Sequence, residues 1–320
     1  MSPLPVIVIG GPTASGKSAL ALAIAGAFHG RIINADSMQV YRDLPILTAQ
    51  PDAADRAQAP HALYGFLALT ELCSAARWAE WALAEIAAAH AAGELPIVIG
   101  GTGLYLRSLM EGMSPIPDVT PGQRAEVQAL LAEIGVAALH ARLGAIDPVM
   151  AGKLHPNDSQ RVMRAWEVLQ ATGRSLADWQ ALPNVPPVGL RFHPWVVLPP
   201  REQLYAACDR RFALMMERGA MEEASAALAL YGEEILAQPG GKALGFADLA
   251  GVAAGQVPLD QAIAAAQQAT RNYAKRQTTW FRNQLRNANF ISPDAENMKF
   301  SESYIGKIFQ NIRDYGLTDL

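Results

Sequence analysis

The segment Gly-Pro-Thr-Ala-Ser-Gly-Lys-Ser at residues 11–18 fits the pattern G-x-x-x-x-G-K-[ST] in full. It follows an apolar run at residues 5–10, typical of a buried strand, and opens an alanine- and leucine-rich run at residues 19–28, typical of a helix. In that setting the backbone N–H groups and the helix N-terminus cradle a phosphate, and the lysine adds a full positive charge. The pattern predicts an α/β protein with an anion-binding loop. It leaves open which phosphate is bound, and a glycine-rich turn without ligand is the alternative.

Two polar residues follow other apolar runs of the chain. Asp36 ends the run at residues 31–36, and Thr102 follows a run at residues 95–101 whose last five residues, Ile-Val-Ile-Gly-Gly, repeat residues 7–11. We interpret these runs as parallel strands that end at one edge of a sheet, where α/β proteins bind their ligands. Both residues are therefore expected beside the phosphate loop. The alternatives are that Asp36 or Ser37 caps a short helix and that Thr102 caps a helix at residues 104–111.

The sheet pattern stops at a proline-rich segment, residues 114–121. From there to about residue 181 only helical periodicity occurs, and a strand-like run returns at residues 191–198. The predicted fold is a P-loop-type parallel sheet flanked by helices, with an all-helical insertion. We expect the α/β core at residues 1–116 and 190–290, the insertion at 117–189, and a peripheral segment without assigned function at 291–320.

Positive charge is concentrated on one face of the predicted helix at residues 261–287. Arg271, Lys275, Arg282 and Arg286 are offset by 0, 4, 11 and 15 residues, so they lie within roughly 60° of one another. No acidic residue interrupts this stretch, which favours a track for nucleic-acid phosphates over a solvated face. In the insertion, Arg161 and Arg164 share a helix face, and two solvated arginines are the equal alternative there.

Composition restricts the class of protein. A net charge of −4 excludes a protein that coats nucleic acid over its whole surface, but it permits a local basic patch. The two cysteines, Cys73 and Cys208, have neither metal-ligand nor disulfide-framework spacing. No apolar run approaches the length of a membrane span, and the first 11 residues lack the basic start of a signal peptide. We expect a cytoplasmic protein that is monomeric and crosses no membrane.

Five segments together resemble the bacterial tRNA dimethylallyltransferases, in order and over residues 5–290. They are the phosphate loop, Asp-Ser-Met-Gln-Val-Tyr-Arg at 36–42, Gly-Gly-Thr-Gly-Leu-Tyr at 100–105, His-Pro-Asn-Asp at 155–158 and Tyr-Ala-Lys-Arg-Gln at 273–277. The resemblance implies transfer of a dimethylallyl group from its diphosphate to N6 of the adenosine 3′ of the tRNA anticodon. It also implies that the helical insertion grips the anticodon stem-loop.

The resemblance also implies roles for individual residues. Asp36 matches the general base that takes a proton from the amine, with Thr102 and Lys17 as further catalytic residues. The expected diphosphate site is Gly11, Pro12, Thr13, Ala14, Ser15, Gly16, Lys17, Ser18 and Arg211, and Ser18 is expected to hold Mg²⁺. The expected tRNA contacts, including the cationic helix face, are Asp36, Ser37, Met38, Gln39, Thr102, Arg124, Gln160, Arg161, Val162, Met163, Arg164, Lys242, Gly245, Arg271, Lys275, Arg282 and Arg286.

The chain departs from the family pattern in two places. Residues 45–51 read Pro-Ile-Leu-Thr-Ala-Gln-Pro, so Gln50 stands where the family commonly has lysine, and Ala247 replaces a residue that is often basic or polar. Two other functions are considered. A small-molecule kinase would use ATP at the same loop, but it needs a lid of clustered arginines. A non-catalytic RNA-binding module would leave the phosphate loop and Asp36 without a role.

Overall fold

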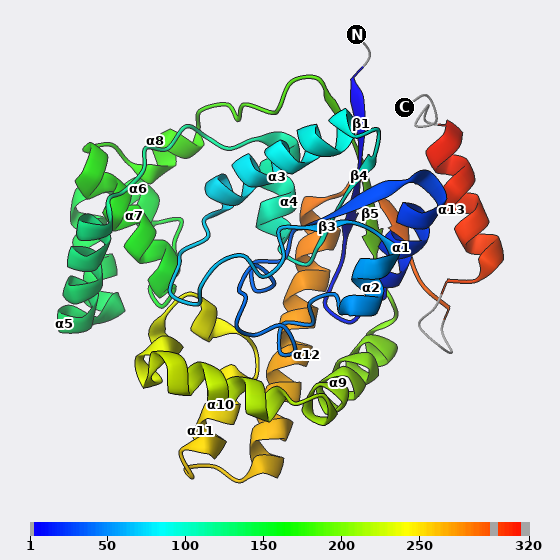
Figure 1. The fold of residues 1–320 in the computed structure, drawn as a ribbon. Helices are drawn as coiled ribbons and strands as arrows, with labels where there is room; N and C mark the ends of the chain where they lie inside the picture. The colour runs from blue at the N-terminus through cyan, green and yellow to red at the C-terminus, as the bar shows by residue number, and fades with distance from the viewer. Residues whose placement is uncertain (1–2, 295–299, 315–320) are drawn as a thin grey trace. The chain divides into compact units, whose positions relative to one another are not determined.

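The computed structural model describes residues 3–294 and 300–314 of the chain. Its centre is a six-stranded sheet in the order β3-β2-β4-β1-β5-β6, and every neighbouring pair is parallel (Figure 1). The predicted parallel α/β sheet is confirmed. The strands are β1 (Leu4–Gly10), β2 (Gly30–Asn34), β3 (His61–Ala62), β4 (Leu95–Gly100), β5 (Leu190–Val197) and β6 (Asn289–Ile291).

The repeated Ile-Val-Ile-Gly segments lie side by side at the centre of the sheet. Strands β1 and β4 are direct neighbours, and Ile7 pairs with Ile97 while Gly10 pairs with Gly100. The two strands therefore end at the same level, as expected, and both turns that follow face one edge of the sheet. A side chain at Gly100 would place its Cβ 2.0 Å from the carbonyl oxygen of Ala35, so glycine is required where the chain after β2 crosses β4.

Helices cover both faces of the sheet. One face packs Ile7 and Ile9 against α1 and α13, and the other packs Val6 and Val8 against α3, α4 and Phe281 of α12. The helices of this unit are α1 (Lys17–Phe28), α2 (Ala53–Gln58), α3 (Ala75–Ala91), α4 (Gly103–Glu111), α9 (Arg201–Glu217), α10 (Ala220–Tyr231), α11 (Phe246–Ala253), α12 (Leu259–Gln284) and α13 (Glu302–Asp314), with 3-10 turns η1 (Glu233–Ala237) and η2 (Gly240–Lys242).

The C-terminal segment contributes to the core. Helix α13 buries Ile308 and Ile312 in the same cluster as Ile7 and Leu20, and Phe309 stacks edge-on against Phe28 of α1. We expected only a peripheral segment at residues 291–320, and that expectation missed the apolar stripe that Ile308 and Ile312 form on α13. Residues 295–299 and 315–320 lie outside the described residues, so the expectation for them stays a prediction.

Residues 111–187 form a separate compact unit, and residues 1–110 and 188–320 form the other. The described elements of the smaller unit are all helical: α5 (Pro121–Ile146), α6 (Pro148–Ala151), α7 (Ser159–Thr172) and α8 (Leu176–Gln180). They enclose a core of their own around Leu139, Leu143, Val162 and Val168. Helix α7 begins at Ser159, where the Asp158 side chain accepts the Arg161 backbone N–H and caps the helix.

Helix α5 corrects one expectation from the sequence. By length and composition it is the one helix within the described residues that could cross a membrane, whereas the sequence was expected to hold no such segment. Gly135 has non-helical backbone angles (φ 77°, ψ 163°) and divides it into two shorter helices. Each half is much shorter than a membrane span. Leu139 and Leu143 of α5 also pack in the helical core, so α5 is weak evidence for a membrane.

Candidate active site

The phosphate loop joins β1 to α1 at the edge where the strands end. Gly16 precedes α1 in the left-handed region (φ 89°), which glycine adopts without strain. The Lys17 ammonium group donates a hydrogen bond to the Pro12 carbonyl oxygen (2.6 Å), so the lysine folds back over its own loop. Burial lowers the pKa of Lys17 to about 8, although Asp36 nearby acts in the opposite direction. An anion bound here would restore the full charge of the lysine.

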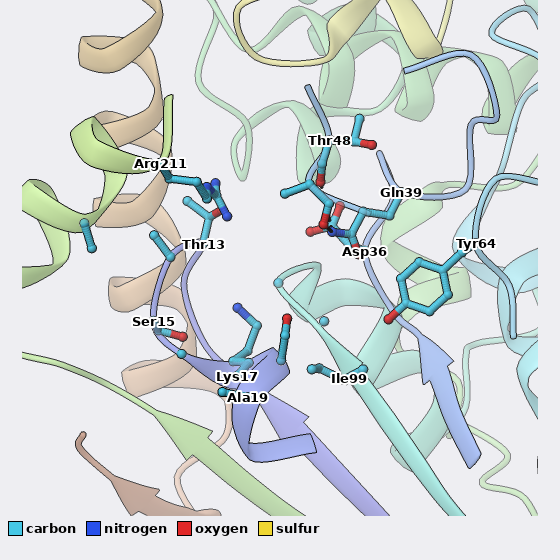
Figure 2. Close-up of a pocket in the computed structure, with 17 residues that line it drawn as sticks. Thr13, Ser15, Lys17, Ala19, Asp36, Gln39, Thr48, Tyr64, Ile99 and Arg211 are labelled. Atoms are coloured by element: carbon cyan, nitrogen blue, oxygen red, sulfur yellow. Dashed lines mark hydrogen bonds between the residues drawn. The ribbon is translucent and has the colours of Figure 1, made fainter. Parts of the chain in front are cut away.

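A cavity of about 350 Å³ opens between this loop and the segment that follows β2. Figure 2 shows Thr13, Ser15 and Lys17 on one side of it and Asp36, Gln39 and Thr48 on the other. Asp36 is the only carboxylate in its lining, whereas two cations, Lys17 and Arg211, contribute to it. The lining therefore carries more cationic than anionic side chains, as a site for an anion requires. It is lined by Thr13, Ala14, Ser15, Gly16, Lys17, Ser18, Ala19, Asp36, Gln39, Thr48, Ala49, Tyr64, Ile99, Gly100, Gly101, Ala207 and Arg211.

The backbone after β2 fixes the Asp36 carboxyl group. The Asp36 backbone N–H donates to Asn34 Oδ1 (2.8 Å), and Asp36 Oδ1 accepts the Met38 backbone N–H (2.9 Å). No helix begins between residues 37 and 52, so the alternative that Asp36 or Ser37 caps a helix is wrong. The carboxyl group closes a local turn instead. In the part of the chain that the structure describes, no hydrogen bond occupies Oδ2.

Thr102 supports the same turn from β4. Its hydroxyl accepts the Ser37 backbone N–H (2.9 Å) and donates to the Ser37 hydroxyl (3.2 Å). Its carbonyl oxygen also accepts the Tyr105 backbone N–H (2.9 Å), at the start of α4. Thr102 thus begins the helix through its backbone while its side chain contacts the Asp36 segment. It does not line the cavity itself.

Arg211 reaches the phosphate loop from α9. Its guanidinium donates a hydrogen bond to the Thr13 hydroxyl. Burial lowers the pKa of Arg211, and the neighbouring Cys208 and Asp36 act in the opposite direction. A guanidinium remains charged even so. The structure therefore brings together the loop, Lys17, Arg211 and Asp36, which were expected to meet at one site.

Three nearby residues were not predicted as site residues. Tyr64 lines the cavity, and burial together with the Asp36 charge raises its pKa. Gln277 of α12 accepts the Thr13 backbone N–H (2.8 Å), and Tyr273 lies one turn before it. Tyr273 and Gln277 occur in the quoted segment 273–277, which could have identified them. No pattern in the sequence distinguishes Tyr64.

The cationic face of α12 is shorter than predicted. Arg271 is ion-paired with Asp209 of α9 (2.5 Å), so its charge is compensated from outside the helix, which the uninterrupted sequence of α12 could not reveal. Lys275 and Arg282 of α12 are exposed. Arg286 is exposed too, but it lies beyond the end of α12 at Gln284, which corrects its expected place on the helix face. Across residues 3–294 and 300–314 none of these three forms an ion pair.

The other expected tRNA contacts differ in accessibility. Lys242 and Gln160 are exposed, Met38, Gln39, Arg124 and Met163 are partly exposed, and Gly245 is buried. In the helical unit, Arg161 and Arg164 pair with acids of their own helix segment, Asp158 (3.4 Å) and Glu167 (3.6 Å). The Val162 side chain is fully buried in the helical core, which corrects the expectation that it contacts tRNA.

The donor set at the loop resembles that of a magnesium site more than that of a transition-metal site. Among the described residues, no group of three or more His, Cys, Asp and Glu side chains could hold a metal. Magnesium needs no such group, because it retains waters and binds one or two protein oxygens together with substrate phosphates. The exposed Ser18 hydroxyl at the cavity wall is an oxygen donor of this kind.

Comparison with known proteins then decides the family. The profile of a family described as IPP transferase matches residues 39–284. The chain belongs to the IPP transferase family. Among relatives in this family, a tRNA dimethylallyltransferase of Rhodospirillum centenum is 56% identical over 290 residues, which cover 90% of this chain and 92% of the relative. One from Paramagnetospirillum magneticum is 54% identical over 98% of both chains.

Solved structures of IPP transferases have the same fold. A tRNA isopentenylpyrophosphate transferase of Bacillus halodurans is 32% identical, with a TM-score of 0.67 over 97% of this chain and 96% of that one. A eukaryotic dimethylallyltransferase acting on tRNA is 28% identical, with a TM-score of 0.80 over 99% of this chain and 80% of that one. The family profile begins at residue 39, after the phosphate loop and Asp36. The relative from Paramagnetospirillum magneticum, which is aligned over 98% of both chains, extends the similarity to these residues.

Proposed function

We propose that this protein transfers the dimethylallyl group of dimethylallyl diphosphate to N6 of the adenosine 3′-adjacent to the anticodon in tRNA. Membership of the IPP transferase family and relatives that carry this activity in their names support the proposal. The observation that carries it is the single cavity in which an anion-binding loop with two cations faces one carboxylate. A transferase whose leaving group is an anion and whose acceptor is an amine needs this combination.

The proposed reaction breaks the C1–O bond of the diphosphate ester and forms a C1–N6 bond. The N6 lone pair is delocalised into the adenine ring, so the amine attacks only when a base removes its proton. Asp36 accepts that proton through the open Oδ2. The diphosphate leaves with the bonding electron pair, and the loop N–H groups, Lys17 and Arg211 stabilise its charge. Thr102 holds the Asp36 segment in place through Ser37.

Ser18 would hold a magnesium ion that also binds the diphosphate, and such an ion supplies further neutralisation of the leaving group. The target adenine must leave the stacked anticodon loop to reach Asp36, so the account includes extrusion of this base into the cavity. Exposed Lys275 and Arg282 on α12 are proposed contacts for the tRNA backbone. Arg124, Gln160, Arg161 and Arg164 of the helical unit keep the same proposed role.

The test incubates the purified protein with magnesium and a tRNA transcript that has adenosine after the anticodon, with either dimethylallyl diphosphate or ATP. We expect a prenylated adenosine by mass spectrometry of the nucleosides and release of inorganic diphosphate. A transcript with guanosine at that position is the matched control and should remain unmodified. Phosphoryl transfer from ATP, or no prenylation of the adenosine transcript, would contradict the proposal and favour the kinase.

A further inference from the structure

Gln277 is a buried amide that connects three segments around the cavity. It lies on the inner face of α12, and only 5% of its surface is exposed. Its Oε1 accepts the backbone N–H of Thr13 in the phosphate loop (2.8 Å). Its Nε2 donates to the carbonyl oxygen of Gly101, in the turn after β4 (2.8 Å). Backbone groups 88 residues apart in sequence are thus joined through one side chain.

Gln277 accepts one of these hydrogen bonds and donates the other, so this position requires a side chain that can do both. One partner is a donor and the other is an acceptor, so the network itself determines which way the amide points. A glutamate could accept from Thr13 but would place a negative oxygen against the Gly101 carbonyl. An apolar residue of the same size would leave both backbone groups without a partner, which is costly in a buried position.

The Gly101 turn is also adjacent to the proposed base. A Cβ atom at Gly101 would lie 2.3 Å from Gln277 Nε2 and 3.4 Å from Asp36 Oδ2. There is therefore no room for a side chain between the amide and the carboxyl group. Burial and the Asp36 charge raise the pKa of Tyr273, one turn earlier on α12, and the Thr102 and Gln277 side chains beside it lower that pKa. Both residues of α12 thus contact the structure that supports Asp36.

We propose that Gln277 is a positioning residue that sets the spacing between the phosphate loop and the Asp36 segment, a role that rests on the proposed function. Because the diphosphate is held at Thr13 and its neighbours while the amine is held at Asp36, this spacing determines whether C1 lies within reach of N6. The same helix exposes Lys275 and Arg282.

The test uses Gln277→Met, which removes both hydrogen bonds at similar volume, and Gln277→Glu, which keeps one. Gln268→Glu is the matched control, because Gln268 is an exposed glutamine of the same helix that bonds Arg271 and Asn272. Single-turnover transfer and the KM values for both substrates are measured beside the melting temperature. We expect about a hundredfold loss of the transfer rate in Gln277→Met, with KM for tRNA nearly unchanged.

The pH profile of Gln277→Glu separates positioning from simple stability. Protonated glutamic acid can accept from Thr13 and donate to Gly101, so it restores both bonds. The ratio of its rate to that of the wild type should rise as pH falls, until the introduced carboxyl group is protonated. The charged or titratable groups around this position are Asp36, which raises the pKa of the introduced group, Lys17 and Arg211, which lower it, and Tyr273.

Two results of the rate measurements would overturn the assignment. One is a Gln277→Met protein that melts earlier but transfers within twofold of the wild-type rate. The other is a rate ratio for Gln277→Glu that does not change with pH. Binding of inorganic diphosphate is measured in parallel by calorimetry, and Gln277→Met should weaken it even if no transfer occurs. An inactive wild type would refute the proposed function, whereas unchanged diphosphate affinity in Gln277→Met would refute the role of Gln277.

Discussion

At the scale of single residues, the two cations of the cavity are desolvated although they are not fully buried. Lys17 and Arg211 are each partly exposed, and desolvation lowers the pKa of both. Asp36 is partly exposed and its Oδ1 is engaged by a backbone N–H. If the proposed function holds, a bound diphosphate would replace the hydration that these two cations lose in the free protein.

Lys17 gives a prediction about pH. Its pKa of about 8 in the free protein means that it is protonated below pH 8 and loses its proton above. Bound diphosphate favours the protonated form, so affinity should fall by up to about tenfold per pH unit above pH 8. Calorimetry with dimethylallyl diphosphate at pH 9 in two buffers should detect proton uptake on binding. Lys17→Arg, which stays charged, should show neither effect, and equal proton uptake in this variant would contradict the account.

At the scale of secondary structure, α12 has two faces of different character. Its inner face carries Gln277 and Phe281, which are buried in the α/β unit, and its outer face carries Lys275 and Arg282. Arg271 belongs to the outer face by sequence but is engaged with Asp209. Helical periodicity predicts which residues share a face of α12. It does not reveal an acidic residue on another helix, such as Asp209 of α9, that pairs with one of them.

The salt dependence of tRNA binding should distinguish Lys275 and Arg282 from Arg271. A cation that neutralises an RNA phosphate contributes about 0.7 to the slope of log affinity against log salt concentration. Lys275→Ala and Arg282→Ala should each reduce the slope for tRNA binding by about this amount. Arg271→Ala should change it less, because Asp209 already compensates Arg271. Filter binding at several salt concentrations measures all three, and an equal effect of Arg271→Ala would refute the distinction.

At the scale of the whole molecule, the sequence predicted the features that depend on local pattern. The phosphate loop, the four longer strands and the helices at 159–172 and 259–284 carry strong periodicity or fixed motifs. Strands β3 and β6 were not predicted because they have only two and three residues. The core contribution of α13 was overlooked although Ile308 and Ile312 are one turn apart, because a mixed polar segment does not show where its apolar stripe packs.

The residues of the candidate site that directly follow strands could be predicted from the sequence. Asp36 and Thr102 both follow strands of a parallel sheet, so their approach to the phosphate loop could be inferred from topology alone. Tyr64 could not, because it lies in an irregular segment whose course is set by tertiary contacts. Gln277 lies in the quoted segment 273–277, but its two hydrogen bonds could not be predicted, since they depend on backbone groups that the sequence does not place. The family resemblance supplied the reaction, which no local pattern contains.

The most direct test of the central claim is the single-turnover rate of Asp36→Asn at saturating tRNA and dimethylallyl diphosphate. Asparagine keeps an oxygen for the Met38 N–H but cannot accept the proton from N6. We expect tRNA affinity within about threefold of the wild type and a transfer rate lower by about 10² to 10⁴. Asp43→Asn, whose carboxylate bonds Tyr231 (3.0 Å) outside the cavity, should keep the wild-type rate. Transfer by Asp36→Asn at a rate close to that of the wild type would contradict the account.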